Sequence, residues 1–355
     1  MAPITLILGG DILPTRRLID PPATAAAVYE RVRAADLAVG NFEMPLTREG
    51  TPVQKLLNIR ADPEIAADAP RLGFRVLTLA NNHAVDYGWA ALEATAGLLR
   101  AQGVAVVGVG STRDRAAALS VHAAAGRRVG VIAFSCLTPT GMSAGPDRPG
   151  ISPLHVETSY EIDPWYQMEE PGDPSVVTIR TRVRRDDQIW AEQLVRKARS
   201  ACDILIVTMH WGFGSGDSLA EYQAPLGRAL IEAGADVIHG HHPHAVHPVG
   251  YHRGAPILFG LGTFIGQQVF LPAPANVQAL WAGMSPDGVL AELRFDEGRT
   301  PTVSLIPTTL DDGRLPRLAT GPDFERIAAR LTRLSAPYGA AVTRGDDRLH
   351  VAPLP

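Results

Sequence analysis

The residues best suited to chemistry in this chain of 355 residues stand directly after short apolar runs. Asp11 follows the run that begins at Ile4, and later runs are followed by carboxyl, amide and imidazole side chains: Asn41, Glu43, Asn81, Asn82, His83 and His210. The run that begins at Asp236 leads into a histidine cluster: His239, His241, His242, His244 and His247. In α/β sheets, ligands bind outside the carboxyl ends of the strands. The spacing therefore predicts one site to which five successive strand ends contribute.

These side chains are of the types that bind divalent cations. Carboxylate and amide oxygens together with imidazole nitrogens are typical ligands of zinc, manganese and iron. Such an ion polarises an ester or amide oxygen and generates hydroxide at neutral pH. A lone histidine is more often a surface or packing residue, but six of the eleven histidines lie between positions 239 and 252. This clustering favours a common role.

The elements that must position these residues alternate between strands and helices. Apolar runs predict strands at 4–8, 37–39, 75–79, 104–107, 119–123, 128–134, 203–209, 236–239, 256–259, 289–295 and 302–307. Amphipathic patterns and capping residues predict helices at 23–33, 63–72, 87–102, 186–200 and 219–233. Strand–helix alternation with short connections indicates a layered α/β sheet.

Two segments depart from this alternation. Residues 138–181 are rich in proline and acidic residues and contain Tyr160, Trp165 and Tyr166. A loop of this length is usually functional or disordered, and the aromatic residues favour an ordered flap over the site. After about residue 310 the chain is rich in Arg, Gly and Pro, with one amphipathic helix near 323–334. We therefore expect one domain over 1–310 with a long loop insertion at 138–181, followed by a C-terminal appendage over 311–355.

Composition and charge exclude several classes of function. The net charge of −4 argues against binding of nucleic-acid phosphates as the main task. Cys136 and Cys202 are the only cysteines, too few for a disulfide framework or a thiolate metal site. The first apolar run has no basic segment before it, and no apolar stretch approaches the ~18 residues of a membrane span. We expect a cytoplasmic protein with neither a nucleic-acid nor a membrane partner, and the sequence does not indicate an oligomeric state.

Several motifs together resemble the CapA family, which is named for poly-γ-glutamate capsule synthesis. The motifs span 10–11, 41–47, 80–88, 210–212, 234–244 and 258–264, and the resemblance covers roughly residues 3–270. The Asn81-Asn82-His83 and His241-His242-Pro243-His244 blocks are highly specific in combination. The family is similar in fold to calcineurin-like metallophosphoesterases. The resemblance thus implies an α/β fold, a layered metallophosphoesterase-like β-sandwich flanked by helices.

The metallophosphoesterase pattern also implies a role for each matching position. Glu43 stands where an aspartate normally bridges two metals, and His83 matches the residue that protonates the leaving group. The implied metal ligands, for one divalent ion of zinc, manganese or iron, are Glu43, Asn82, His210 and His242. The implied catalytic residues are Asp11, His83 and His244.

The chain also departs from that pattern. A histidine usually stands two residues after the first aspartate, but this position is Leu13, so a second ion beside Asp11 is expected to bind weakly. The nearby Arg16 suits a substrate carboxylate or phosphate, or else it neutralises Asp11 and Glu43. CapA proteins of capsule systems usually carry a membrane anchor, and none is visible here. The residues expected to bind substrate are Arg16, Asn81, Trp211 and His241, the last standing where the pattern usually has glycine.

Three functions compete. The favoured one is a metal-dependent hydrolase of an ester, amide or phosphoester bond in a small acidic or peptide-like substrate. The second is a metal-independent epimerase, isomerase or lyase, as in a peptide epimerase that resembles this family, with Asp11 and a histidine as acid and base. Each such group contributes roughly 10²–10⁴-fold, so that reaction needs an already acidic proton. The third is a non-catalytic binding or assembly factor for an acidic polymer such as poly-γ-glutamate.

Overall fold

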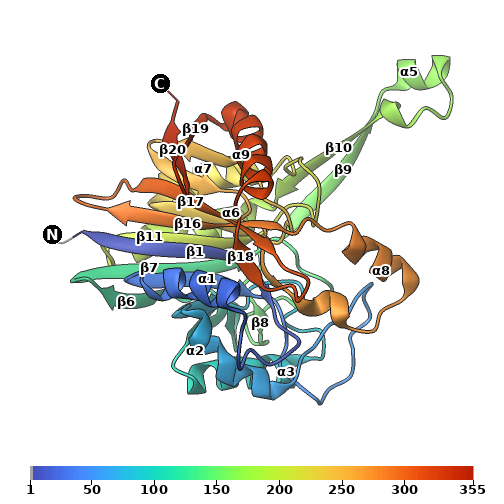
Figure 1. Ribbon diagram of the computed structural model, residues 1–355. Helices are drawn as coiled ribbons and strands as arrows, with labels where there is room; N and C mark the ends of the chain where they lie inside the picture. The colour runs from blue at the N-terminus through green and yellow to red at the C-terminus, as the bar shows by residue number, and fades with distance from the viewer. Residues whose placement is uncertain (1–2, 355) are drawn as a thin grey trace.

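Two large β-sheets packed face to face form the centre of the computed structural model, which describes residues 3–354 (Figure 1). The ten-stranded sheet has the order β19-β20-β17-β16-β1-β2-β3-β4, with β15 beside β1 and β18 beside β17. Its strands are β1 (Ile4–Leu13), β2 (Leu37–Phe42), β3 (Val76–Thr78), β4 (Ala105–Val107), β15 (Thr263–Gly266), β16 (Asp287–Phe295), β17 (Thr302–Leu310), β18 (Pro316–Leu318), β19 (Ala340–Arg344) and β20 (Leu349–Pro353).

The second sheet has six strands in the order β13-β14-β12-β11-β7-β6. They are β6 (Ser120–Ala124), β7 (Arg127–Ser135), β11 (Ile204–His210), β12 (Val237–His241), β13 (Val249–His252) and β14 (Ala255–Leu258). The helices are α1 (Ala23–Arg33), α2 (Ala69–Leu72), α3 (Trp89–Ala101), α4 (Arg113–Ala116), α5 (Pro164–Glu169), α6 (Arg185–Arg199), α7 (Gln223–Ala233), α8 (Ala275–Ala282) and α9 (Pro322–Ser335). Short 3-10 turns are η1 (Pro63–Asp68), η2 (Pro174–Val176), η3 (Gln267–Phe270) and η4 (Ala336–Tyr338).

The alternation of side chains along β1 explains the layers. Leu6 and Leu8 are buried between the two sheets, whereas Ile7 points to the opposite face, where Val28 of α1 and Leu92 of α3 cover it. Successive residues of a strand point to opposite faces, so one strand serves both cores. Burial of each such side chain contributes roughly 1.5–3 kcal/mol. A third core lies between the outer face of the six-stranded sheet and helices α6 and α7.

The strands at the centre of both sheets are parallel. β1, β2, β3 and β4 run side by side in one sheet, and β7, β11 and β12 do so in the other. Parallel neighbours end at the same edge of a sheet, so the loops after these strands meet. The predicted fold class, a layered α/β sandwich flanked by helices, is confirmed.

The insertion at 138–181 contains regular structure that the sequence analysis did not predict. β5 (Val109–Gly110) pairs with β8 (Gly150–Ile151), and β9 (Val156–Ile162) pairs with β10 (Val177–Val183) as an antiparallel ribbon that carries α5. We call residues 156–183 the arm. It projects away from the two sheets (Figure 1), so this part of the expected flap is an extended ribbon and does not lie against the sheets. The strands form because aromatic and β-branched residues alternate with charged ones.

The segment over 311–355, expected as an appendage, contributes strands β18, β19 and β20 to the ten-stranded sheet. β20 pairs with β17, and β19 pairs with β20 at the outer edge. Helix α9 covers this edge through Phe324, Ile327 and Leu331, which lie in the core between the sheets. Within residues 3–354, no helix has the length and apolar character that a membrane crossing requires.

Candidate functional site

Backbone register brings the predicted residues together. Asp11 on β1 is paired with Asn41 on β2, and His210 on β11 is paired with His241 on β12. Within residues 3–354, the structure contains three overlapping groups of possible ligand atoms, all within 4.8 Å of one another in each group. The groups are Asp11, His210 and His241; Glu43, His210 and His242; and Asp11, Glu43 and His244. The two sheets therefore contribute opposite sides of one site.

A close approach of two backbones places Asp11. Its amide N–H donates to the carbonyl oxygen of Gly262, 3.1 Å away, where β15 begins beside β1. A Cβ on the preceding residue, Gly10, would lie 1.9 Å from the same oxygen. Only glycine fits at position 10, which explains why the Gly10-Asp11 pair belongs to the motif.

Two buried carboxyl groups, Asp11 and Glu43, share one amide donor. The Asn41 Nδ2 group donates to Asp11 Oδ1 at 2.8 Å and to Glu43 Oε2 at 3.1 Å. Burial alone would raise the pKa of Asp11, but its contacts with His244 and Asn41 lower it to about 2. Burial and the charge of Asp11 raise the pKa of Glu43 well above its usual value. Ionisation of Glu43 beside the charged Asp11 is therefore disfavoured, and a divalent cation would favour the ionised form of both groups.

Two of the histidines opposite them, His210 and His242, are neutral. Burial lowers the pKa of His210 well below its usual value and that of His242 to about 3. His210 Nε2 lies 2.7 Å from Asn82 Oδ1 and 3.7 Å from Glu43 Oε1. His242 adopts φ = 96°, a left-handed conformation that costs a non-glycine residue about 1–3 kcal/mol. Neutral imidazoles held in this way offer lone pairs to a cation.

The residues present fit a divalent metal ion. Glu43 Oε1 is buried and has no hydrogen-bond partner among the described residues, and Asp11 Oδ2 has only a 3.3 Å contact with His244 Nδ1. A buried carboxylate oxygen without a partner is costly unless it binds a cation. Leu13 lies in the apolar core and offers no ligand, as expected. The fit is therefore best on the side of Glu43, Asn82, His210 and His242.

His83 has two partners that the sequence analysis missed. Its Nδ1 lies 2.7 Å from Asp86 Oδ2, and Lys55 Nζ lies 2.6 Å from Asp86 Oδ1. Burial lowers the pKa of His83, and the carboxylate of Asp86 opposes this effect. Asp86 belongs to the Ala80–Gly88 motif, so its place three residues after His83 could have indicated a contact with it. Nothing in the sequence indicates that Lys55 reaches Asp86.

Three of the four expected substrate-binding residues are buried in the structure. Trp211 is fully buried, stacks on Phe259 and donates from Nε1 to its carbonyl oxygen, so it belongs to the core. Asn81 is buried and holds the Asn41 side chain and the Phe42 carbonyl group. His241 is buried behind His210. None of the three presents a free polar group to a substrate.

Arg16, the fourth, is exposed. Its guanidinium lies 3.9 Å from the ring centroid of Phe270, and it makes no ion pair with Asp11 or Glu43 among the described residues. Solvent reaches the site at Asn82 and His242, which are partly exposed. The loop after β11 passes close by, because the carbonyl oxygen of Gly214 accepts from the His244 amide at 3.3 Å.

The chain is similar in sequence to a bacterial protein family and to named bacterial proteins. The profile described as "Bacterial capsule synthesis protein PGA_cap" matches residues 5–268. The chain is 29% identical over 268 residues to the PGA biosynthesis protein CapA of Bacillus subtilis. This alignment covers 73% of this chain and 62% of that protein. It is 29% identical over 346 residues to a Mycobacterium tuberculosis protein named "Probable polyglutamine synthesis accessory protein", covering 94% and 81% of the two chains.

Among solved structures, one named a novel phosphatase from Mycoplasma pneumoniae is similar with a TM-score of 0.47 and 13% identity. The alignment covers 88% of this chain and 96% of that chain. Similarity at this level supports no conclusion about function.

Proposed function

The chain belongs to the bacterial capsule synthesis protein PGA_cap family, and from this premise we propose that it is a metal-dependent hydrolase. Its substrate is proposed to be a small acidic or peptide-like molecule with an ester, amide or phosphoester bond. One observation carries the proposal: the unpartnered Glu43 Oε1 lies 3.7 Å from Nε2 of the neutral His210, and a carboxylate oxygen of Glu43 lies within 4.8 Å of a His242 nitrogen. A cation satisfies all three groups at once.

Each side chain has a distinct task in this proposal. Glu43, Asn82, His210 and His242 would hold the ion, whose contribution is to polarise the substrate oxygen and to acidify water. Asp86 holds the proton of His83 on Nδ1, so Nε2 is the atom that exchanges a proton with the leaving group. Because burial lowers the pKa of His83, an anionic substrate beside Nε2 would favour its protonated form.

The acidic substrate class has separate support. The relatives named above are named for PGA biosynthesis and for polyglutamine synthesis, which supports a peptide-like substrate. Polyglutamine is uncharged, so the acidic character rests on the poly-γ-glutamate for which the family is named. Arg16 is exposed and free of ion pairs with the site carboxylates, so its guanidinium is available to a substrate carboxylate or phosphate.

Metal analysis combined with a substrate panel tests the proposal. The purified chain is stripped with chelator, reloaded with zinc, manganese or iron, and assayed on p-nitrophenyl phosphate, γ-glutamyl-p-nitroanilide and short glutamate oligomers. We expect turnover of at least one bond class that requires the metal and is lost in Glu43→Gln. Full activity in the stripped protein would rule out the metal-dependent reaction.

The contact between Asp11 and His244 favours one alternative. His244 Nδ1 lies 3.3 Å from Asp11 Oδ2, which is an acid–base pair that requires no metal. An epimerase of this kind would incorporate solvent deuterium at a substrate Cα after exhaustive chelation, whereas a hydrolase would not. Binding of glutamate oligomers with neither hydrolysis nor exchange would instead indicate an assembly factor.

A further inference from the structure

A chain of buried polar contacts runs behind His210, away from the proposed metal ion. It begins at the carbonyl oxygen of Gly9, which lies 2.9 Å from His239 Nε2. His239 Nδ1 lies 3.2 Å from Thr208 Oγ1, and Thr208 Oγ1 lies 2.9 Å from His241 Nε2. The chain ends where His241 Nδ1 meets His210 Nδ1 at 2.8 Å. All four side chains are at most 1% exposed, so water does not replace these contacts.

The fixed end of this chain determines where each proton lies. A carbonyl oxygen only accepts hydrogen bonds, so His239 must donate from Nε2. Burial lowers the pKa of His239 to about 4, so the ring is neutral and its Nδ1 carries a lone pair. The Thr208 hydroxyl has one proton and must therefore donate it to His239 Nδ1.

The same reasoning continues to His210. Because the Thr208 hydroxyl has given its proton to His239, it accepts from His241 Nε2. Neutral His241 then has a lone pair on Nδ1, which accepts the proton of His210 Nδ1. This leaves His210 Nε2 without a proton, 2.7 Å from the amide of Asn82 and 3.7 Å from Glu43 Oε1. An Asn82 amide that presents its nitrogen would donate to Nε2. With Oδ1 in that place, as in the structure, two lone pairs meet across 2.7 Å, and a cation bound to both atoms would relieve their repulsion.

We propose that the chain from the Gly9 carbonyl through His239, Thr208 and His241 fixes the tautomer of His210, so that Nε2 faces the metal ion as a ready ligand. The inference rests on the proposed function for the identity of the ion, but the tautomer exists in the metal-free protein. His239, Thr208 and His241 are positioning residues, since they act through His210. Partners of this kind typically contribute about 10–100-fold to metal affinity.

The hydroxyl of Thr208 is the link most open to testing. In Thr208→Val the side chain keeps its shape but has no hydroxyl, so it can neither donate to His239 Nδ1 nor accept from His241 Nε2. His241 is then free to carry its proton on Nδ1, which places the His210 proton on Nε2 and blocks the ligand atom. Thr208→Ser retains the hydroxyl and serves as the conservative rescue. Thr95→Val removes another buried hydroxyl, on α3, which contacts Ala91 and Leu46 rather than the site.

Two measurements decide the proposal. First, long-range nitrogen–proton correlation spectra of the metal-free chain with isotope-labelled histidine should show the Nδ1–H tautomer for His210, assigned with His210→Gln. An Nε2–H tautomer would overturn the proposal, whatever the fate of the hydrolase. Second, chelator competition should show zinc affinity reduced about 10–100-fold in Thr208→Val and nearly unchanged in Thr208→Ser and Thr95→Val. Equal zinc affinity in Thr208→Val and Thr95→Val would also overturn it.

The two proposals fail separately. If the wild-type chain binds no zinc, manganese or iron, the proposed function is wrong, and the spectra of the metal-free chain still decide the tautomer of His210. If it binds metal but shows the Nε2–H tautomer, only the role of the chain of contacts is wrong.

Discussion

The paired carboxyl groups of Asp11 and Glu43 set the chemistry of the site at the scale of single residues. They are fully buried and share the amide of Asn41, so only one of them ionises easily without a cation. Water cannot relieve this repulsion, because the groups are shielded from it. The two carboxyl groups are thus arranged to bind a cation from solution, whose positive charge offsets their mutual repulsion.

Glu43→Gln tests this arrangement. The amide has nearly the shape of the protonated carboxyl group, so the metal-free protein should keep its thermal stability. Zinc affinity should fall by more than the roughly 10–100-fold that outer partners contribute, because an anionic ligand is lost. Chelator competition and thermal unfolding measure the two effects, with Glu292→Gln on β16 as a control away from the site. Unchanged zinc affinity would show that Glu43 is not a ligand.

His83→Asn is expected to separate proton transfer from metal binding. His83 contacts Asp86 and Lys55 and belongs to none of the three groups of ligand atoms. Loss of the imidazole should therefore lower kcat by roughly 10²–10⁴-fold, the usual contribution of one acid–base group. Metal content, measured on the same sample, should stay the same. Parallel loss of metal and activity would contradict the role of His83 as general acid.

Most residues of the candidate site could be predicted from the sequence, but their partners could not. Strand-end position and motif spacing indicated Asp11, Glu43, Asn82 and His210, which the structure brings together. Thr208 gave no signal, because an isolated threonine inside an apolar strand is typical of a β-sheet interior. Its contacts with His239 and His241 depend on the register between β11 and β12, which no sequence pattern reveals.

At the scale of elements, the arm shows where pattern reading fails. Its strands place Tyr160 opposite Ile179 and Ile162 opposite Val177, so one face is apolar and the other carries ion pairs such as Arg180–Glu161. The acidic residues and prolines between the strands hid this alternation. By contrast, α1 has the same bounds as predicted, because Pro22 and an apolar stripe define it locally.

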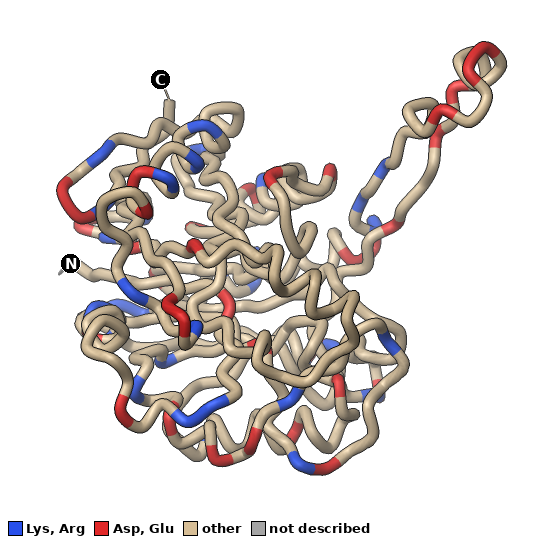
Figure 2. The backbone as a smooth tube through the Cα atoms, turned by 45° about the vertical axis from the view of Figure 1, so that its right-hand side comes forward, with Lys and Arg blue, Asp and Glu red and all other residues tan. Residues whose placement is uncertain are grey.

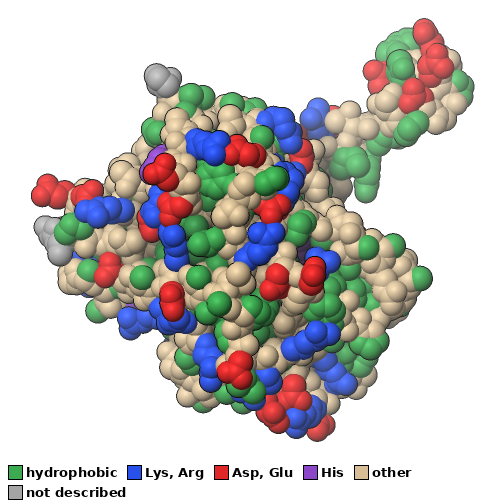
Figure 3. All heavy atoms as spheres, in the orientation of Figure 1, with side chains coloured by type: hydrophobic (Ala, Val, Ile, Leu, Met, Phe, Trp, Pro, Cys, Tyr) green, Lys and Arg blue, Asp and Glu red, His purple; other side chains and the backbone are tan. Residues whose placement is uncertain are grey.

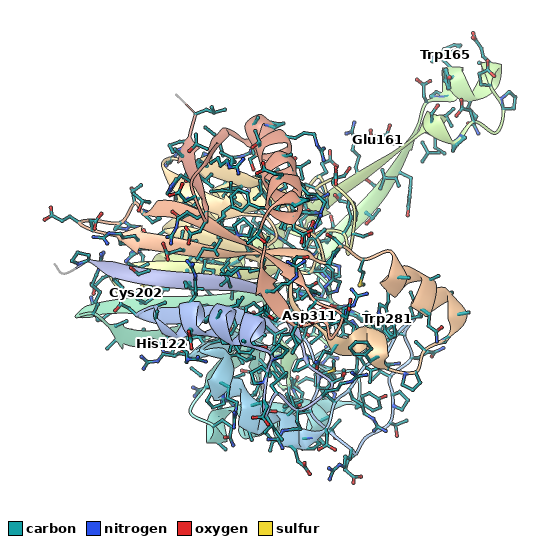
Figure 4. All side chains as sticks on the ribbon, viewed as in Figure 1. His122, Glu161, Trp165, Cys202, Trp281 and Asp311 are labelled. Atoms are coloured by element: carbon teal, nitrogen blue, oxygen red, sulfur yellow. The ribbon has the colours of Figure 1, made fainter. Side chains whose placement is uncertain are left out.

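The arm leads to a prediction about kinetics. The tip of the arm lies far from the sheets and carries acidic residues (Figure 2) and hydrophobic groups (Figure 3). Trp165 lies at the end of the arm, beyond Glu161 (Figure 4). Trp165 is 75% exposed. Replacing residues 163–176 by a two-residue hairpin turn should leave kcat, KM for small substrates and zinc affinity unchanged. A rise in KM in the folded variant would show that the arm bends over the site.

An ion pair between the partly exposed Arg17 and the buried carboxylate of Asp68 attaches the loop after β1 to the turn before α2. Arg17 donates to both oxygens of Asp68, and the Leu18 amide donates to Asp68 Oδ2 at 2.8 Å. Burial alone would raise the pKa of Asp68, but these hydrogen bonds outweigh it and lower the pKa. A carboxyl group with a lowered pKa stabilises the fold above its unfolded-state pKa of about 3.9 and loses this effect as pH falls through the folded value.

Asp68→Asn should therefore lower the free energy of unfolding at neutral pH by about 1.5–3 kcal/mol, the range for hydrogen bonds to charged groups. The difference from the wild-type chain should shrink below about pH 4, where Asp68 becomes protonated in the unfolded chain, and should be lost as pH falls further through the lowered folded pKa. Denaturant unfolding at several pH values measures it. A difference that is constant from pH 7 to the acid limb would mean that the charge of Asp68 contributes nothing.

At the scale of the whole molecule, the site joins the two sheets. Asp11 lies near the end of β1, and Glu43 and Asn82 follow strands of the same ten-stranded sheet. His210, His242 and His244 end or follow strands of the six-stranded sheet. A ligand that contacts both groups binds only when the sandwich is assembled. By linkage, metal binding must then stabilise the whole fold rather than one loop.

This coupling predicts a metal-dependent melting temperature. Zinc at about 100 times its dissociation constant should add about 2.7 kcal/mol to the free energy of unfolding, if the unfolded chain binds none. The melting temperature should rise steadily with zinc concentration in scanning calorimetry. In Glu43→Gln the same zinc concentrations should have a much smaller effect, since its dissociation constant is higher. His83→Asn, which keeps every proposed ligand, should respond as the wild-type chain does. If zinc binds, as dialysis would show, but leaves the melting temperature unchanged, the unfolded chain binds zinc equally well, and the site does not depend on the assembled sandwich.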